Sequence, residues 1–335
     1  PYPLRRQRQM CIRDRPLNVA PEPEDNRNAV AILSNGHHSV MLSTTGAGYM
    51  TYGRLAVTRW RPDPTFDHGG SFLFLRDTAS GMWWSASTSP RRAKRETAGA
   101  VFSDHKAEFH KVAHGIDSRM EVIVAAEANA EGRRIVLRNL GTEARTIEIT
   151  SYGEIVLDRA EADAAHPAFS KMFIRTEVWE NGRVITARRN RRTAGDRQLH
   201  LAHFLSGPPE GRGTEFETDR RAFIGRGRTL GTAAAFDQGA ELTGATGFTL
   251  DPIFSLRRRI RILPRKEASL IFWTVVTDTA EELERAVAHY SRAETFEHES
   301  RLAWTYSQVQ LRHLEIQLEE AALFRPVSYT HLTLP

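Results

Sequence analysis

The chain has 335 residues, of which 40% are hydrophobic and 26% charged, a composition typical of a folded globular protein. No run approaches the roughly 20 apolar residues that cross a bilayer, and residues 1–9 lack the apolar core of a secretory signal. The net charge is +5, but five arginines against one aspartate in residues 1–15 leave +4 there, so the rest of the chain is nearly neutral and nucleic acid is not expected as a partner.

The two ends of the chain differ from its body. Met-Cys-Ile-Arg-Asp-Arg at 10–15 and Val-Ser-Tyr-Thr-His-Leu-Thr-Leu-Pro at 327–335 resemble translated sequencing adapters. Pro326 breaks a helical pattern just before the second string. We therefore expect non-native tails at 1–15 and 327–335, the alternative being native disordered tails. The only cysteine, Cys11, lies in the first tail, so no internal disulfide is expected.

The body of the chain, residues 28–277, consists of short strand-like runs separated by turn signals such as Asn35-Gly36 and Asn181-Gly182. No helical period interrupts these runs. Many short strands at close spacing predict a mainly β fold, a large antiparallel β-sandwich. The clearest strands are expected at 120–126, 146–152, 256–263 and 268–276.

Helices are predicted at the end of the chain. Thr279 and Glu282 have the spacing of a capping box, which begins a helix that continues to about Ser291. A second helix is expected from about Phe296 to Phe324. Its apolar stripe consists of Leu302, Tyr306, Val309 and Ile316. The segment 279–325 is therefore expected to form C-terminal linker helices after the sandwich.

Arginine, aspartate and tryptophan gather between Asn35 and Pro90. Sugars present apolar ring faces and rows of hydroxyls, which proteins meet with aromatic rings and with charged or amide side chains. The alternative, which composition alone favours, is that the tryptophans belong to the core and the Arg–Asp pairs are structural. The candidate sugar-contacting residues of this segment are Arg59, Trp60, Asp63, Asp67, Arg76, Asp77, Trp83 and Trp84.

These segments resemble the N-terminal β-sandwich (supersandwich) domain of the glycoside phosphorylases of glycoside hydrolase family 94, formerly glycosyltransferase family 36. The resemblance covers about residues 28–325. Residues 221–230 and 250–257 are similar to the version found in the C-terminal region of bacterial cyclic β-1,2-glucan synthases, and residues 307–314 to the linker helix before that family's catalytic barrel. The other stretches that carry the resemblance are 131–135, 150–154 and 165–171.

The resemblance implies reversible phosphorolysis of a β-glucosidic bond with inversion. One carboxylic acid protonates the leaving oxygen while inorganic phosphate attacks the opposite face. In the family, that acid and the phosphate-binding residues lie in an (α/α)6 barrel downstream of the linker. We therefore expect this chain to end before the barrel, to hold no catalytic residue and to be inactive alone. Glu108, Glu154 and Glu177 lie in strand-like runs, where a structural role is expected.

Two histidine motifs are candidates for further sites. His37 and His38 are adjacent, so in a strand they point to opposite faces, and a metal site is not expected there. His166 precedes Pro167 in a stretch that resembles a structural corner of the family, and we include it among the candidate substrate-binding residues. No cofactor is expected; inorganic phosphate is the co-substrate that the resemblance implies for the parent enzyme.

The sequence therefore predicts a carbohydrate-binding accessory domain of a family 94-type enzyme in β-glucan metabolism. The alternative is a purely structural scaffold and dimerisation domain without sugar contact. The expected partners are a β-glucan or glucooligosaccharide, the catalytic barrel of the same polypeptide and a second copy in a homodimer. No membrane span is expected in this segment. We expect a cytoplasmic location, the parent being a candidate inner-membrane protein with this region on the cytoplasmic side.

Overall fold

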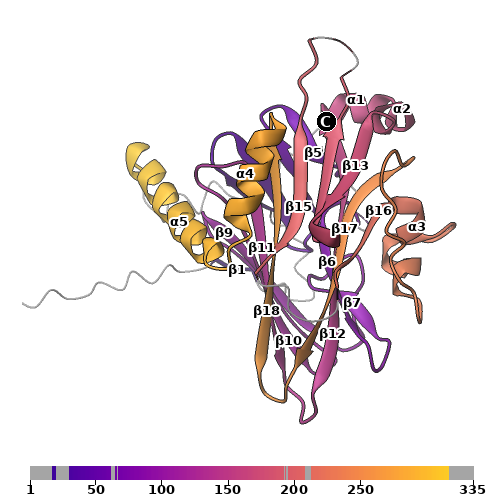
Figure 1. The fold of residues 1–335 in the computed structure, drawn as a ribbon. Helices are drawn as coiled ribbons and strands as arrows, with labels where there is room; N and C mark the ends of the chain where they lie inside the picture. The colour runs from indigo at the N-terminus through magenta and orange to yellow at the C-terminus, as the bar shows by residue number, and fades with distance from the viewer. Residues whose placement is uncertain are drawn as a thin grey trace, which may run out of the picture.

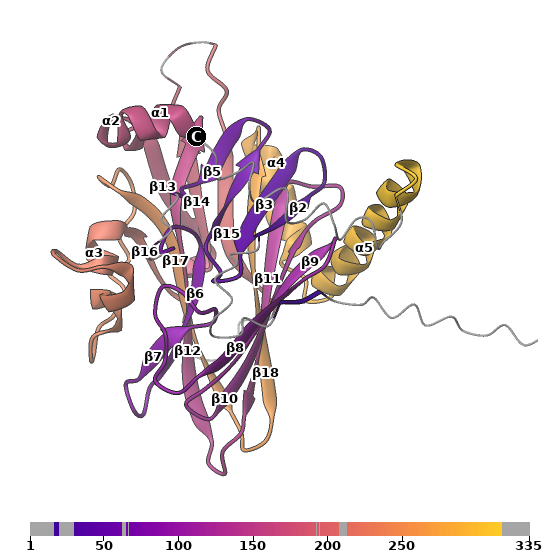
Figure 2. The ribbon, with the colours of Figure 1, turned by 180° about the vertical axis from the view of Figure 1, so that it is seen from behind.

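The computed structural model describes residues 17–19, 30–61, 65, 67–191, 193, 195–207 and 213–316. Two large antiparallel sheets lie face to face in this part of the chain (Figures 1 and 2). The predicted mainly-β sandwich, followed by C-terminal helices, is therefore confirmed. The two predicted tails and residues 317–325 of the predicted linker lie outside the described residues.

The first sheet has nine strands in the described part of the chain, and all its pairings are antiparallel. Its two halves come from distant parts of the sequence, which meet where β11 pairs with β18. In spatial order the strands are β1 (Leu17–Val19), β8 (Thr97–Phe102), β9 (Lys106–Ala113), β10 (Ile116–Val124), β11 (Ala130–Asn139), β18 (Glu267–Thr277), β15 (His200–Ser206), β14 (Val184–Arg189) and β13 (Ile174–Trp179).

The second sheet is organised around its longest strand, β12 (Arg145–Asp158). The first half of β12 pairs with β6 and its last residues pair with β5, so the sheet divides along this strand. The remaining strands are β16 (Glu215–Asp219), β17 (Pro252–Ile262), β5 (Leu55–Thr58), β4 (Gly48–Tyr52), β3 (His38–Ser43), β2 (Val30–Ser34), β6 (Phe72–Asp77) and β7 (Trp83–Ser85).

Close packing explains why glycine stands at position 153, in the middle of β12. The ring of Phe254 on β17 lies over Gly153, and a Cβ at that position would stand 2.2 Å from Phe254 Cζ. Glycine in a strand interior commonly marks such a close approach. The flanking Tyr152 and Glu154 point to the opposite face, and both take part in the charged cluster described below.

Three apolar layers hold the sandwich together. The central layer fills the space between the sheets, with Trp84, Phe109, Ile135, Ile149 and Phe272 among its members. A second layer lies between the first sheet and α4 (Ala280–Tyr290), which crosses the outer face of that sheet in Figure 1. A third covers the outer face of the second sheet with α3 (Arg220–Ile224), η2 (Leu230–Thr232) and η3 (Ala234–Phe236). Because the central strands are buried on both faces, apolar and polar residues alternate little along their sequences.

The two C-terminal helices follow the prediction at their starts and depart from it at the end of the second. The Thr279 hydroxyl accepts a hydrogen bond from the N–H of Glu282 and begins α4, as predicted. Helix α5 (Thr295–His313) ends well before the predicted Phe324. The predicted apolar stripe is confirmed in part, since Leu302 and Tyr306 are half-buried, whereas Val309 is exposed and Ile316 lies beyond the end of α5. The buried side of α5 consists of Thr295, Phe296, Glu299, Ala303 and Ser307.

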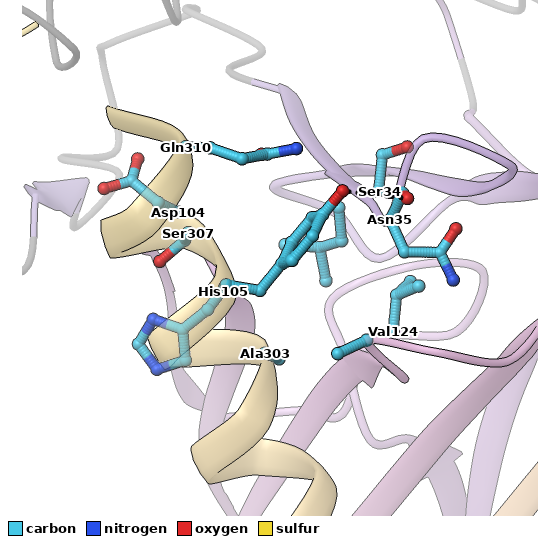
Figure 3. Close-up of a pocket in the computed structure, with 11 residues that line it drawn as sticks. Ser34, Asn35, Asp104, His105, Val124, Ala303, Ser307 and Gln310 are labelled. Carbon is cyan, nitrogen blue, oxygen red and sulfur yellow. Dashed lines mark hydrogen bonds between the residues drawn. The ribbon is translucent and has the colours of Figure 1, made fainter. Parts of the chain in front are cut away.

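Helix α5 rests on the sandwich through polar contacts as well as through Phe296. The hydroxyl of Tyr306 donates to the carbonyl oxygen of Asn35, in the turn between β2 and β3. A small pocket of about 30 Å³ remains between helix and sandwich. Figure 3 shows Ala303, Ser307 and Gln310 of α5 on one side of it, with Ser34 and Asn35 across from them. A polar pocket of this size holds about one water molecule, so it is too small for a sugar.

Short helices lie between some of the strands. The sequence did not predict these helices. They include α1 (Ala160–Ala165), α2 (Pro167–Lys171) and α3. Helices of five or six residues make at most two turns, too few to show helical periodicity. In the described part of the chain, no helix has the length and apolar character needed to cross a membrane.

Candidate functional site

Four of the predicted sugar-contacting residues are buried in the fold, namely Arg59, Arg76, Asp77 and Trp84. Trp84 is fully buried in the central layer and packs against His114 at 4.9 Å between ring centroids. Arg76 is ion-paired with the buried Glu148, and Asp77 with Arg145. Because these side chains are closed off from solvent, their burial argues against the predicted sugar contacts at Arg59, Arg76, Asp77 and Trp84.

Trp83 is partly exposed, but both faces of its ring are occupied. Phe236 stacks on Trp83 with ring centroids 4.2 Å apart and an interplanar angle of 22°. The guanidinium carbon of Arg91 lies 4.1 Å from the centre of the same ring. A sugar that stacks on a tryptophan needs one free face, and this packing leaves none to Trp83.

Trp60 and Asp67 both contact the β3–β4 hairpin, Trp60 through Tyr49 of β4 and Asp67 through Ser43 and Thr45. The ring of Trp60 is partly exposed and stacks on Tyr49 at 5.5 Å, and a Cβ at Gly69 would lie 3.4 Å from it. The Asp67 carboxylate accepts hydrogen bonds from Ser43 and Thr45. Asp63 lies outside the described residues. Of the predicted set in this segment, Trp60 is therefore the aromatic ring with the best access to a ligand.

Arg59 lies at the centre of a buried charged cluster at the end of the sandwich that carries α1 and α2. Its Nε and Nη2 each donate to the Asp163 carboxylate of α1 at 2.7 Å. Its Nη1 donates to Glu154 at 2.8 Å. We call this cluster the ion network; its members are Arg59, Glu154, Asp163, Lys171, Arg220 and Asp251.

The rest of the ion network joins segments that are far apart in the sequence. Arg220 at the start of α3 donates to Glu154 at 2.7 Å, and Lys171 at the end of α2 reaches Asp251, just before β17, at 2.7 Å. The hydroxyl of Tyr152 also donates to Glu154. The three cations and three carboxylates thus bind α1, α2, α3, β12 and the start of β17 into one unit.

The pairing fixes the protonation state of the network. Burial alone would raise the pKa of Glu154, but the positive charges of Arg220 and Arg59 outweigh it and hold the pKa at about 2. Burial likewise acts to lower the pKa of Arg59, and its hydrogen bonds with Asp163 and Glu154 raise it instead. A carboxylate with such a low pKa stays ionised at neutral pH, so Glu154 is not suited to act as a general acid.

Above the ion network, helices α1 and α2 present an exposed apolar surface. Phe169 and Met172 are 50% and 60% exposed, and across the Lys171–Asp251 ion pair Phe248 and Leu250 are 61% and 79% exposed. His166 lies exposed between α1 and α2. We call this surface the apolar face; its members are Ala164, Ala165, Ala168, Phe169, Met172, Phe248 and Leu250.

The sequence did not identify the apolar face. Its members come from two segments about 80 residues apart, residues 164–172 and 248–250, and neither segment is long or strongly apolar. The signal that was available is the cluster of small and apolar residues around His166-Pro167, which is interpreted above as a structural corner with His166 as a candidate substrate-binding residue. Large apolar side chains exposed together on a soluble domain commonly mark a contact surface.

Ser151, His203 and Thr274 form a buried polar triad inside the sandwich. Ser151 Oγ lies 2.8 Å from His203 Nε2, and His203 Nδ1 lies 2.9 Å from Thr274 Oγ1. The imidazole is stacked on Phe254 at 4.2 Å and is 3% exposed. The arrangement resembles a nucleophile and its base, but the adjoining cavity of about 10 Å³ admits no substrate. The triad therefore satisfies polar groups within the core.

The carboxylates considered as catalytic acids are engaged in ion pairs. Glu108 pairs with Lys106, Glu177 with Arg175, and Glu154 belongs to the ion network. Among the described residues, no group of three or more His, Cys, Asp or Glu side chains is placed to hold a metal ion. The strongest features of this end of the molecule are thus a neutralised ion network and the apolar face above it.

A protein-family model described as "Glycosyl hydrolase 94, supersandwich domain" matches residues 14–293. The cyclic beta-(1,2)-glucan synthase NdvB of Rhizobium meliloti (strain 1021) is 51% identical over 310 residues, which are 92% of this chain and 11% of that protein. The N,N'-diacetylchitobiose phosphorylase of Vibrio proteolyticus is 29% identical over 132 residues, which are 37% of this chain and 16% of that protein. The chain thus spans a small part of the length of these relatives.

Among solved structures, a bacterial glucoamylase complexed with acarbose contains a similar fold. The TM-score is 0.53 at 9% sequence identity, over 86% of this chain and 37% of that one. At this identity the likeness concerns the fold alone.

Proposed function

The chain belongs to the glycosyl hydrolase 94 supersandwich family, and from this premise we propose that it is an accessory domain of a family 94-type enzyme in β-glucan metabolism. The parent polypeptide is a cyclic β-1,2-glucan synthase or a glycoside phosphorylase that takes inorganic phosphate as co-substrate on the cytoplasmic side. Its chemistry takes place in a helical (α/α)6 barrel of the same polypeptide. The domain described here supplies no catalytic acid and acts by docking on that barrel.

The observation that carries this proposal is the apolar face above the neutralised ion network. An interface core is depleted in charged side chains and enriched in aromatic residues and methionine. The apolar face meets this description. Its large members Phe169, Met172, Phe248 and Leu250 are exposed and stand within three residues of Lys171 or Asp251, whose charges are paired. The network below fixes α1 and α2 in place, so the face is preorganised and little ordering is needed on docking.

Two further points support a helical domain as the occupant of the apolar face. The relatives are much longer than this chain, which covers 11% of the glucan synthase and 16% of the phosphorylase. Alanines at 164, 165 and 168 stand beside Phe169 and Met172, and small residues next to large ones form the holes that a helix needs for close packing.

We expect Leu250→Asp to disrupt this docking without unfolding the domain. Leu250 is 79% exposed, so the substitution does not disturb the core, but in a docked interface it buries an unpaired carboxylate. The test replaces the matching stretch of the Rhizobium synthase with this chain. The chimera should make cyclic glucan, and Leu250→Asp or Phe169→Asp should lower its activity by about tenfold or more.

The matched control is Leu263→Asp. Leu263 is 53% exposed in the turn between β17 and β18, at the opposite end of the sandwich. It should leave the activity of the chimera unchanged. Full activity in both Leu250→Asp and Phe169→Asp would contradict docking through the apolar face. Equal loss in Leu263→Asp would point to a general effect of the new charge.

A second candidate function, direct sugar contact, rests on Trp60. Its ring is partly exposed and is held in place by stacking on Tyr49. Arg59 next to it belongs to the ion network, and Asp67 is close by in the chain. A partly exposed ring that is held in place beside polar groups can serve as a platform for a pyranose. His166 is exposed as well, but it lies between α1 and α2, next in sequence to members of the apolar face, and we assign it to docking.

For this second candidate we expect β-1,2-glucooligosaccharides at millimolar concentration to change the tryptophan emission of the chain. Trp60→Phe should abolish the change because it removes the ring that the sugar covers. The matched control is Trp304→Phe, which removes a tryptophan that is 37% exposed on α5 and should leave the change intact. Emission that stays constant throughout the titration would leave docking as the only role of the domain.

A further inference from the structure

Three basic side chains form a row on the outer face of the first sheet, and we call them the basic row. Arg175 of β13 lies directly opposite Arg188 of β14, and Arg188 lies directly opposite His200 of β15. Residues directly opposite each other in antiparallel strands share a face, with Cβ atoms about 5 Å apart. The face is the outer one, because Val184 of β14 belongs to the apolar layer under α4 and side chains alternate along a strand.

The basic row borders the apolar face. Thr176, next to Arg175, is joined to Gly247 by two backbone hydrogen bonds of 2.9 Å, and Gly247 precedes Phe248 of the apolar face. Strand β13 begins shortly after α2, so the basic row lies at the end of the sheet that carries α1 and α2, at the top of Figure 1. The two surfaces therefore meet at β13, the last strand of the first sheet.

Arg188 is half-buried and lacks a partner in the part of the chain that the structure describes. Its guanidinium makes no ion pair or hydrogen bond there, and its Nε atom is closed off from solvent. Buried donors nearly always have an acceptor. The next residue, Arg189, meets this rule, since it pairs with Asp158 at 2.7 Å and donates to the carbonyl oxygen of Ser170 at 2.8 Å. An acceptor for Arg188 is therefore expected from another part of the assembly.

The charge of Arg188 is also unfavourable where it stands in the sheet. Like charges directly opposite each other destabilise a pair of strands, and Arg175 lies opposite Arg188. Arg175 has a partner of its own, Glu177, at 3.2 Å. Burial, together with the positive charge of Arg188, lowers the pKa of His200, so this imidazole is neutral at pH 7 and leaves the charge of Arg188 unbalanced.

The carboxylates nearest to the basic row do not reach Arg188. Asp278 is paired with Arg197. Glu281 is exposed in the first turn of α4 and forms no ion pair with Arg188. A residue that breaks a local rule without compensation inside the fold commonly marks a functional position.

We propose that the basic row is the charged rim of the docking surface and that Arg188 receives a carboxylate of the partner domain. This inference rests on the proposed function, in which the partner is the helical barrel of the same polypeptide. Protein interfaces combine an apolar core with a polar rim, and the apolar face and the basic row supply one each. Arginine binds a carboxylate through two parallel hydrogen bonds, and the Nε–H of Arg188 is available for one of them. Complementary charges at the rim then fix the orientation in which the two domains dock.

The first test follows thermal unfolding of the chain alone. Arg188→Gln should raise the midpoint by about 1–2 °C, because it removes a like charge opposite Arg175. The matched contrast is Arg189→Gln, which removes a paired arginine from the next position of the same strand and should lower the midpoint. A midpoint that does not rise in Arg188→Gln would mean that the fold itself satisfies this arginine. That result would overturn the inference whatever the role of the apolar face.

The second test uses the chimera with the Rhizobium synthase. Arg188→Gln should lower its synthesis of cyclic glucan by about tenfold. The matched control is Arg119→Gln, since Arg119 is an exposed arginine of β10 on the outer face of the same sheet, and it should leave the activity unchanged. Equal loss in this control would reduce the effect to net charge and overturn the basic row.

The two proposals can fail separately in this experiment. Loss of activity in Leu250→Asp but not in Arg188→Gln would overturn the basic row and leave docking through the apolar face intact. Full activity in both variants would remove docking itself, and with it the proposed function.

Discussion

Replacing Arg59 by methionine is expected to lower the free energy of unfolding of the domain by about 3–5 kcal/mol. Arg59 is 7% exposed and is the shared partner of Asp163 and Glu154. Without it the bidentate partner of Asp163 is lost, and a buried carboxylate remains uncompensated inside the protein. Chemical denaturation at pH 7, followed by far-ultraviolet circular dichroism, measures the loss.

Two further variants separate lost charge pairing from lost packing. In Arg59→Met with Asp163→Leu, the uncompensated carboxylate is absent, and Glu154 keeps Arg220, so part of the stability should return. Arg228→Met removes an arginine whose ion pair with Asp237 is exposed, and it should leave the free energy of unfolding unchanged within error. If the double variant were as unstable as Arg59→Met, the uncompensated charge would not be the cause.

The sequence predicted the sandwich because strands and turns are local signals. Runs such as 120–126 and 268–276 carry apolar and β-branched residues, and they correspond to β10 and β18. The pairing of β11 with β18 joins segments more than 120 residues apart in the chain, and no local pattern encodes such a contact. The end of α5 was predicted too late because the helical period continues in the sequence after His313, whereas the described helix ends there.

The candidate site was harder to predict because composition does not report burial. Arg59, Arg76 and Asp77 have the chemistry of sugar recognition, yet in the fold they neutralise Asp163, Glu148 and Arg145. The same side chains can bind a sugar or form an ion pair within the protein. Their role depends on whether the fold places an oppositely charged side chain next to them. Trp60 remains a prediction, since its ring is partly exposed and its contact with sugar is untested.

The apolar face was also hard to predict, because the sequence does not show which apolar residues are exposed. Phe169 and Leu250 are ordinary apolar residues in the sequence, and a reader of the sequence assigns such residues to the core. In the fold both are exposed, and the Lys171–Asp251 ion pair joins the two segments that carry them. Their exposure depends on contacts between segments about 80 residues apart, which no local pattern of the sequence encodes.

Lowering the pH from 7 to 5 is expected to destabilise the domain through two buried histidines. Burial lowers the pKa of His38 to about 4, and burial together with the charge of Arg133 lowers the pKa of His203 to about 3. Both therefore stay neutral in the folded protein at pH 5, whereas in the unfolded chain they bind protons below about pH 6.5. Each histidine should cost the fold about 2 kcal/mol between pH 7 and pH 5.

The direction and window of this effect follow from the sign of the shifts. A histidine with a lowered pKa contributes stability above pH 6.5, and the contribution is lost as the pH falls, until the folded protein takes up the proton near pH 4 for His38 and pH 3 for His203. Glu154, with its pKa held at about 2, loses its contribution only below about pH 4.5. Between pH 7 and pH 5 the loss of stability therefore includes the two histidines and no contribution from Glu154.

The variant His203→Gln isolates one of the two histidines. His203 lies between Ser151 and Thr274, so glutamine keeps hydrogen-bonding capacity at the position and removes the titrating group. Its free energy of unfolding should fall less steeply than that of the native chain between pH 6 and pH 5, by about 1 kcal/mol per pH unit. Denaturation curves at pH 7, 6 and 5 for both proteins give the two slopes. Since all other titrating groups are common to both proteins, equal slopes would mean that the imidazole of His203 is protonated in the folded state, and the buried triad would then have to accommodate a charge.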